Sequence, residues 1–423
     1  MSTFFRKTSI YFIANIINAA IPFLLLPILT RYLSVEEYGQ IAMFQLLIAG
    51  LAGIIGLNTV GAAGRKFYDK GVTESELRAY NTSCLWVLFF STLFIVLLTL
   101  IFDEELASIL SISSDWIYFA IVVSTGSFII QLRLNQWQIR GEAKRYGALQ
   151  VGNSLLNLCA SLAFVVLYSM GASGRIDALV TTSIIISIVA LYFLVKNKLL
   201  RFSLPNKKNI IEALSFGVPL VPHVFGAFLL SSADRYVIND NLGLAAAGIY
   251  LLAFQLSSAL TIVFDAINKS YVPWLFKNLA KEDDTIKLSI VKNTYSYFAL
   301  LIFVALAGFF IGPLVVTFVA GKQFADASYI IGWLLLGQVF GGMYLMVTNY
   351  MFYSKQTAKL SFVTITCGLI NVLLMFILVK MHGILGAAIA FSVSKGIQFF
   401  LTWVYAFKAV KMPWLYFYNT ESK

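Results

Sequence analysis

Residues 294–319, TYSYFALLIFVALAGFFIGPLVVTFV, contain no charged side chain over 26 consecutive positions. A helix needs about 20 mainly apolar residues to cross the hydrocarbon core of a bilayer, so this stretch is long enough to span a membrane. The rest of the chain repeats the pattern, since hydrophobic residues make up 59% of 423 positions and charged residues only 12%. The sequence therefore predicts an all-α polytopic membrane protein rather than a water-soluble core.

Short polar loops divide the chain into about twelve predicted transmembrane helices. The spans are expected at 9–29, 40–62, 83–102, 116–137, 147–170, 176–195, 211–233, 242–267, 294–319, 327–352, 360–379 and 383–407.

The basic residues indicate the orientation of these spans. Seven segments that face one side hold 25 of the 31 Lys and Arg residues, and Lys395 lies inside the last span. Positive residues mark the cytoplasmic side, so both termini are expected in the cytoplasm and the number of spans is even. The net charge of +11 then reflects topology and does not favour nucleic-acid binding.

Three pairs of segments repeat with shifts of 204, 210 and 214 residues, which predicts two six-helix lobes with the same orientation. Parallel repeats of this kind are related by a pseudo-two-fold axis along the membrane normal, with the substrate path between them. We expect an N-terminal lobe with a cytoplasmic linker at 1–205 and a C-terminal lobe at 206–423. The matched segments are 30–33 with 234–237, 44–46 with 254–256, and Asn135 and Asn157 with Asn349 and Asn371.

Polar residues recur at helical spacing in several spans, as Asn15 and Asn18 do in the first and Gln150, Asn153 and Asn157 in the fifth. Steps of three and four residues keep each set on one helix face. Two interpretations remain open. The stripes form hydrogen bonds between helices, or they line a hydrated central cavity.

Lys395 lies twelve positions into its span, too central for its stem to reach an interface easily. A charge there costs about 2.5–3.5 kcal/mol on insertion scales, so it should face a cavity or an acidic partner. Either Lys395 pairs with Asp265 or another carboxylate, or it contacts an anionic ligand.

Four further residues have both a structural and a functional interpretation. Arg31 and Arg235, matched by the repeat, present planar forks suited to phosphate, or they are interfacial arginines, with Asp234 as the partner of Arg235. Arg65 is a cytoplasmic anchor or part of an entrance. His223 gates or carries a proton, or it is a packing residue.

Sequence motifs for catalysis are absent. The chain has no Walker A loop, no dinucleotide fingerprint and no paired His or Cys at metal-ligand spacing. We therefore expect a transporter without catalytic residues, cofactor or metal, rather than an enzyme. Energy would come from an ion gradient, the membrane potential or consumption of the product.

Short motifs in order along the chain resemble the bacterial polysaccharide (O-antigen repeat-unit) flippases of the multidrug/oligosaccharidyl-lipid/polysaccharide exporter superfamily. They are PFLLLP at 22–27, TRYLS at 30–34, EYG at 37–39, PLVPH at 219–223, DRY at 234–236 and AGIY at 247–250.

The resemblance implies that the protein moves an undecaprenyl-pyrophosphate-linked repeat unit, as in lipopolysaccharide biosynthesis, to the outer leaflet of the bacterial inner membrane. The polyprenyl tail stays in membrane lipid, and one lobe rocks against the other in alternating access. A polysaccharide polymerase and a chain-length regulator are the implied partners.

The candidate residues fall into three roles under this hypothesis. Those expected to bind pyrophosphate or anionic sugar are Arg31, Arg235 and Lys395, with Arg65 at the entrance; those expected to contact sugar are Gln45, Gln255, Asn135 and Asn349; those expected to couple or gate are Asp234, Asp265 and His223.

Two rival functions remain. An ion-coupled multidrug antiporter of the same superfamily should carry a cluster of intramembrane carboxylates, whereas Asp265 stands nearly alone. A polymerase or ligase of lipid-linked sugars should have a long external loop, and the acidic segment 103–115 is too short to fold as a site.

Overall fold

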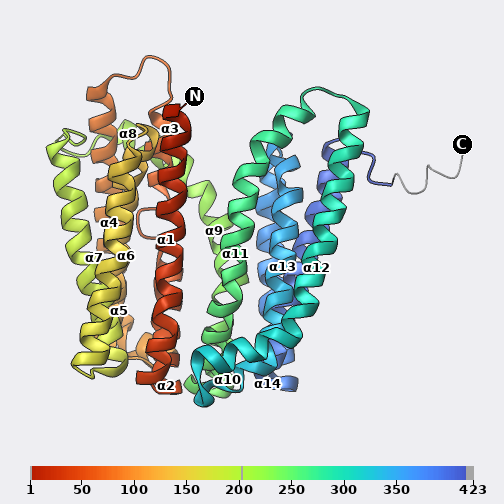
Figure 1. Cartoon of the computed structure of the whole chain (residues 1–423). Helices are drawn as coiled ribbons and strands as arrows, with labels where there is room; N and C mark the ends of the chain where they lie inside the picture. Colours follow the sequence, from red (N-terminus) through yellow and green to blue (C-terminus); the bar gives the residue numbers. More distant parts are fainter. Residues whose placement is uncertain (1, 202, 416–423) are drawn as a thin grey trace, which may run out of the picture. The chain divides into compact units, whose positions relative to one another are not determined.

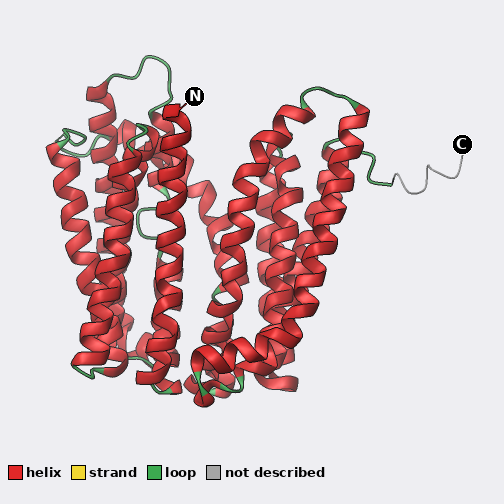
Figure 2. Ribbon diagram, viewed as in Figure 1, coloured by secondary structure: helices red, strands yellow, loops and turns green. Residues whose placement is uncertain are grey.

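The computed structural model describes residues 2–201 and 203–415; the side chains of residues 2–13 and 357 lie outside this description. The described chain is helical throughout and contains no strand (Figures 1 and 2). It divides into two compact units, the first formed by Met1–Phe228 and Leu242–Gly248 and the second by Leu229–Asn241 and Ile249–Lys423. The predicted all-α class is confirmed.

Most helices are long enough to cross a membrane, and short π and 3₁₀ turns connect a few of them. In the first part of the chain they are α1 (Ser2–Tyr32), α2 (Val35–Leu51), α3 (Thr59–Lys66), α4 (Glu74–Leu110), α5 (Ser114–Ile139), α6 (Ala143–Ser161), the π-helix η1 (Leu162–Leu167), α7 (Gly171–Lys196), α8 (Lys207–Gly217), the 3₁₀-helix η2 (Val218–Leu220) and α9 (Val221–Ser231). There follow α10 (Asp234–Leu242), α11 (Leu244–Leu279), α12 (Asp284–Ala320), the 3₁₀-helix η3 (Lys322–Phe324), α13 (Ala327–Tyr353) and α14 (Thr357–Ala409).

Within the described residues, ten helical segments are long and apolar enough to cross a membrane, against the twelve spans expected from the sequence. The difference arises at two places, the predicted spans 40–62 and 360–407. Both differences arise from local backbone angles, and a hydropathy pattern carries no information on such angles.

The predicted span at 40–62 is broken between α2 and α3. The backbone of Gly56, Leu57 and Asn58 adopts positive φ angles of 76°, 46° and 56°, which a continuous α-helix excludes. The Ser91 hydroxyl of α4 accepts a hydrogen bond from the Gly56 amide at 2.9 Å, so a neighbouring helix stabilises the break. The apolar stretch is thus two helices joined by a strained turn.

The last two predicted spans form one element, α14, because no loop separates them. The helix changes direction at Gly383, whose φ of 59° and ψ of −141° lie in a region that residues with a Cβ avoid. Counting the two arms of α14 separately, and α2 with α3 as one interrupted span, accounts for the twelve expected spans.

The division into units groups α8 and most of α9 with the first part of the chain. The contacts that hold α8 there include Lys66 Nζ to Glu212 Oε1 at 2.7 Å. The boundary expected at 205/206 and the symmetry relation between two lobes stay predictions.

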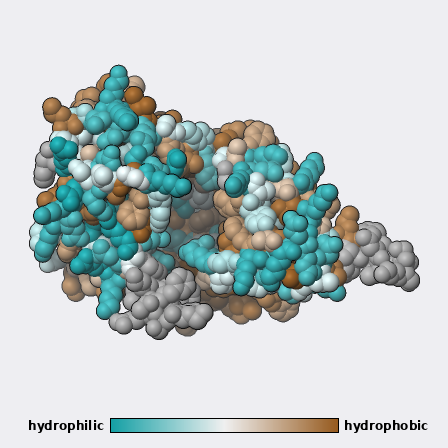
Figure 3. All heavy atoms as spheres, turned by 90° about the horizontal axis from the view of Figure 1, so that it is seen from above, coloured by the Kyte–Doolittle hydropathy of each residue, from teal (hydrophilic) through white to brown (hydrophobic). Residues whose placement is uncertain are grey.

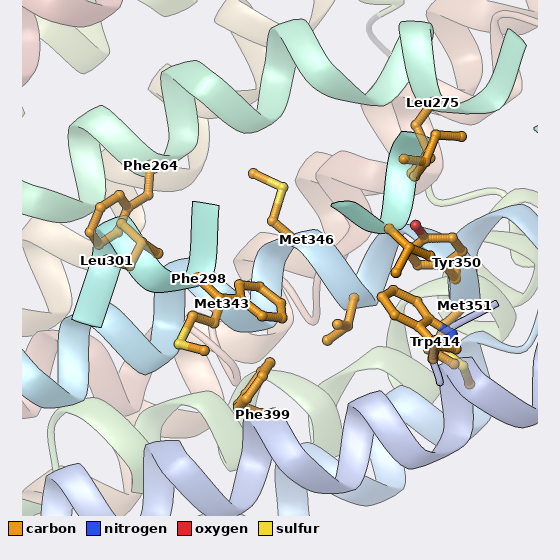
Figure 4. Packing of buried hydrophobic residues seen from close by; sticks show 14 of the residues in the cluster. Phe264, Leu275, Phe298, Leu301, Met343, Met346, Tyr350, Met351, Phe399 and Trp414 are labelled. Atoms are coloured by element: carbon orange, nitrogen blue, oxygen red, sulfur yellow. The ribbon is translucent and has the colours of Figure 1, made fainter. Parts of the chain in front are cut away.

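Aromatic and sulfur-containing side chains fill the interior of the second unit. Phe264, Phe298, Met343 and Phe399, from α11, α12, α13 and α14, pack in one buried cluster (Figure 4). By contrast, Phe318 on α12 is 87% exposed, as are many apolar side chains of this helix to a lesser degree. A helix with one apolar face in the core and another uncovered is what a lipid environment requires.

Candidate functional site

A polar cavity lies inside the first unit, among α1, α5, α6 and α7. Its volume is about 300 Å³, and no Asp or Glu lines it. The polar residues around it are Asn18, Ser127, Asn153, Ser154, Asn157, Arg175, Thr182 and Ser183.

The polar stripes of the first and fifth predicted spans face each other beside this cavity. Gln150 Nε2 donates to Asn15 Oδ1 at 3.1 Å, and the Ser154 hydroxyl donates to Asn18 Oδ1. In the first unit, some members of these stripes therefore form hydrogen bonds between helices, and others line a cavity within the unit. The hydrated central cavity stays a prediction.

Arg175 on α7 contributes the cavity's positive charge. Its Nη1 donates to Asn157 Oδ1 at 2.8 Å and to the Ser161 hydroxyl at 2.5 Å. Arg175 was not among the candidate site residues; it is one of the few basic residues outside the seven basic segments. Two features of the sequence could have indicated this site. The polar stripe of the fifth predicted span ends at Asn157, and Arg175 directly precedes the sixth predicted span.

At another end of the first unit, Arg65 is exposed at the end of α3, with its guanidinium 5.6 Å from the Phe216 ring. Its neighbour Lys66 bonds to Glu212, and this contact raises the pKa of Lys66. Hydrophilic residues gather over this end of the unit (Figure 3). Arg65 is thus exposed, as an entrance residue must be, whereas its neighbour Lys66 is held in an ion pair with Glu212.

Asn135 on α5 lies against the same helix. A Cβ at Gly64 would stand 2.7 Å from Asn135 Oδ1, and that oxygen is buried without a hydrogen-bond partner. Arg31 is exposed near the end of α1, and Gln45 is half-buried on α2. In the first unit, therefore, the predicted site residues do not form a single cluster of mutual hydrogen bonds.

In the second unit, Asp234 and Arg235 begin α10 and are only 1% and 6% exposed. Asp234 Oδ1 accepts a hydrogen bond from the Arg235 amide at 2.9 Å, and the guanidinium lies 5.3 Å from the Phe254 ring. Arg31 and Arg235, matched in sequence, thus differ in environment: one is exposed and the other is buried against an aromatic ring.

Lys395 does not pair with Asp265. The Asp265 carboxylate instead lies 2.9 Å from Lys269 Nζ, one turn along α11, and both side chains are more than half exposed. Lys395 is half-buried, and its Nζ stands 5.8 Å from the Phe391 ring. Of the two interpretations of Lys395, the structural pair with Asp265 is wrong, because a partner on its own helix is closer to Asp265.

The remaining candidates are dispersed. Asn349 is 3% exposed and donates from Nδ2 to Asn268 Oδ1 at 2.8 Å. Gln255 is half-buried on α11. His223 is half-buried on α9, and its Nδ1 has no hydrogen-bond partner. Within the described residues, no group of three or more His, Cys, Asp or Glu could hold a metal ion.

A sequence model of the polysaccharide biosynthesis protein family matches residues 4–279. An uncharacterized membrane protein of Haemophilus influenzae is 26% identical over 371 residues, covering 86% of this chain and 88% of the relative. A putative O-antigen transporter of Shigella dysenteriae is 24% identical over 410 residues, with coverage of 91% and 95%. A probable low-salt glycan biosynthesis flippase, Agl15 of Haloferax volcanii, is 22% identical, with coverage of 92% and 80%.

Solved structures share the fold at 15% sequence identity. An inward-facing multidrug resistance transporter of the MATE family in the MOP superfamily gives a TM-score of 0.69 and covers 95% of this chain and 96% of its own. The lipid II flippase MurJ, in an inward closed conformation, gives 0.68 with coverage of 96% and 87%. This fold occurs both in a protein named as a multidrug resistance transporter and in one named as a lipid II flippase, so fold alone does not separate the two functions.

Proposed function

This chain belongs to the polysaccharide biosynthesis protein family, and on that premise we propose that it is a lipid-linked oligosaccharide flippase. Its cargo is an undecaprenyl-pyrophosphate-linked repeat unit of O-antigen or another polysaccharide. It moves this cargo from the cytoplasmic to the periplasmic leaflet of the bacterial inner membrane by alternating access, with both termini in the cytoplasm. It performs no catalysis.

The observation that carries the proposal is the environment of Lys395. This residue lies within α14, in the second of its two arms, and no Asp or Glu of the described chain forms an ion pair with it. A cation in the membrane interior is costly unless an opposite charge meets it. A pyrophosphate group that passes through the protein supplies such a charge.

The other cations are assigned by their exposure. Arg31 and Arg65 are exposed, so they are placed to meet a phosphate without breaking an existing contact. Arg235 is nearly buried, and its Nε has no hydrogen-bond partner. We assign it to pyrophosphate or anionic sugar after a movement that uncovers it.

The sugar contacts are assigned with the same criterion. Gln45 and Gln255 are half-buried, and the free oxygen of Asn135 accepts a hydroxyl hydrogen bond. Asn349 already donates a hydrogen bond to Asn268, so we assign it a smaller part in sugar binding. His223 and Asp234 are assigned to gating, and the polymerase and chain-length regulator remain the proposed partners.

An ion-coupled drug antiporter is the alternative. Such a protein needs an intramembrane carboxylate that faces a cation, whereas Asp265 is exposed and paired with Lys269. Because Asp265 is paired in this way, it is a poor candidate for ion coupling. The test that follows includes a result that would favour the antiporter.

The test is leaflet exchange of a fluorescent polyprenyl-pyrophosphate oligosaccharide in sealed proteoliposomes. Lys395→Met keeps the length of the side chain and removes its charge. We expect the exchange rate to fall at least tenfold, because one charge-assisted contact is worth roughly 1.5–3 kcal/mol. Lys395→Arg should restore most of the rate.

Lys380→Met is the matched control, since Lys380 is an exposed lysine on the same helix. Its rate should stay within about twofold of the native protein. Exchange that survives Lys395→Met would keep the flippase and reassign this lysine to structure. No exchange, together with gradient-driven movement of organic cations, would replace the flippase by the antiporter.

A further inference from the structure

The cavity of the first unit combines one cation with neutral hydrogen-bonding groups. Arg175 contributes the charge, and the amides and hydroxyls of α1, α5, α6 and α7 surround it. Within the described residues, no carboxylate lies within ion-pair distance of Arg175. A buried charge is stable only when an opposite charge or several hydrogen bonds compensate it.

The carboxylates that come near this part of α7 are used elsewhere. Glu37 Oε2 accepts from the Ser34 amide at 2.8 Å, and Glu37 Oε1 accepts from the Ala172 amide at 3.2 Å. Asp177 follows Arg175 by two positions, and residues at this spacing do not share a helix face. Neither neutralises the guanidinium.

The guanidinium has donors to spare. Its Nη1 donates to Asn157 and Ser161, and both of these partners are neutral, so neither cancels the positive charge. A guanidinium carries five N–H groups and no acceptor, so Arg175 can donate to a ligand in the cavity in addition to these two partners.

Thr182 gives an independent indication. It lines the same cavity, is 3% exposed, and its hydroxyl has no hydrogen-bond partner. An unsatisfied buried hydroxyl costs about 1–3 kcal/mol, so such groups usually mark bound water or a ligand. Arg175 and Thr182 stand on one helix, seven residues apart, which places them on the same face two turns from each other.

We propose that this cavity is a binding site for a small monovalent anion of the chloride class, held by Arg175 and Thr182 within the first unit. A single cation matches a single negative charge, and the neutral amides and hydroxyls supply the remaining donors. The volume of about 300 Å³ is large enough for a hydrated ion. The inference concerns one unit and does not depend on the proposed flippase activity.

The test measures thermal unfolding of the purified protein in detergent. Sodium chloride or bromide replaces sodium gluconate at constant ionic strength, because a ligand that binds only the folded state raises the unfolding midpoint in a saturable way. We expect a saturable rise with either halide and none with gluconate alone.

Three variants locate the effect. Arg175→Gln should abolish the rise or increase the apparent Kd at least tenfold. Thr182→Val keeps the shape and removes only a hydroxyl without a partner, so the protein should fold and the apparent Kd should increase about threefold. Arg201→Gln removes the same charge from an exposed loop of the same unit and should leave the halide dependence unchanged.

Several outcomes would overturn the proposal. A halide effect that persists in Arg175→Gln places the ion elsewhere. If Arg175→Gln does not fold, Thr182→Val decides: an unchanged apparent Kd for halide in this variant would also show that the ion binds elsewhere. Saturation by inorganic phosphate but not by halides contradicts a monovalent ligand, and no saturable effect of any anion contradicts the site.

Discussion

At the scale of single residues, the basic side chains of this protein differ in what surrounds them. Arg140 makes two contacts with the Glu74 carboxylate, at 2.9 and 3.2 Å, and is accounted for by an ion pair. Arg133 is fully buried on the same helix end, with its guanidinium 3.9 Å from the Trp137 ring and all three nitrogens without a hydrogen bond. Removing the charge should therefore have opposite effects on stability at these two positions.

We predict that Arg133→Met stabilises the protein. The contact with Trp137 contributes about 2 kcal/mol when desolvated, whereas burying the charge costs several kcal/mol. Methionine keeps the apolar volume without the charge, so the free energy of unfolding should rise by about 1–2 kcal/mol. The midpoint of unfolding by heat, in detergent, measures this.

Arg140→Met is the matched control, because it removes the same charge seven residues later, directly after the end of α5, but breaks a paired contact. Its stability should be equal to that of the native protein or lower by up to about 1 kcal/mol. If Arg133→Met is the less stable of the two variants, the buried guanidinium has a partner that offsets its desolvation.

At the scale of elements, α2 closely approaches the first residues of α11, Leu244–Gly248, which belong to the first unit, and this gives a physical reason for two of the short motifs. A Cβ at Gly39, in EYG, would lie 2.0 Å from the carbonyl oxygen of Leu244. A Cβ at Gly248, in AGIY, would lie 2.2 Å from the carbonyl oxygen of Val35. Small residues let helix backbones approach closely in membranes, where no hydrophobic force drives helices together.

Gly39→Ala should therefore destabilise the first unit. The added methyl group meets backbone, which cannot rotate away, so α2 and α11 must separate and lose packing. We expect a loss of about 1–3 kcal/mol, the usual cost of overpacking. The measurement is the unfolding midpoint together with the yield of folded protein after extraction.

Gly53→Ala serves as the control for this substitution. Its Cβ would stand 3.5 Å from a side-chain carbon of Val224, an ordinary van der Waals distance. The change should cost less than about 1 kcal/mol. Equal losses in both variants would show that a methyl group added at any packed glycine, rather than the close approach of the backbones, determines the effect.

At the scale of the whole molecule, the hydropathy of the sequence predicted the fold class but not the arrangement of the site residues. Long apolar stretches such as 294–319 predict helices well, because burial in lipid depends on local composition. The break at Gly56–Asn58 escaped prediction, since a few backbone angles change the path without changing composition. The boundary expected between the spans 360–379 and 383–407 falls at the bend of Gly383, although no loop forms there.

The location of charge inside the units escaped prediction for a different reason. Counting basic residues by side puts Arg133 on the cytoplasmic side and Arg175 on the opposite side, but packing places one against Trp137 and the other beside a polar cavity. Similarly, Asp265 was a candidate for Lys395 until the structure placed Lys269 one turn away. The contacts of Arg133 with Trp137 and of Asp265 with Lys269 join residues four apart on one helix. The burial of Arg133 and the cavity beside Arg175 depend instead on packing between segments far apart in sequence, which one sequence does not report.

The membrane topology itself gives the last prediction. Seven segments hold most of the basic residues, so the loop before α5 should face the periplasm and the linker before α8 the cytoplasm. Ser113 and Ser203 are exposed in these two segments and provide matched positions for cysteine. In a background with Cys84, Cys159 and Cys367 replaced by alanine, an impermeant maleimide should label Ser113→Cys in intact spheroplasts. Ser203→Cys should react only after the membrane is opened, and the reverse pattern would contradict the cytoplasmic termini and the direction of transport proposed from them.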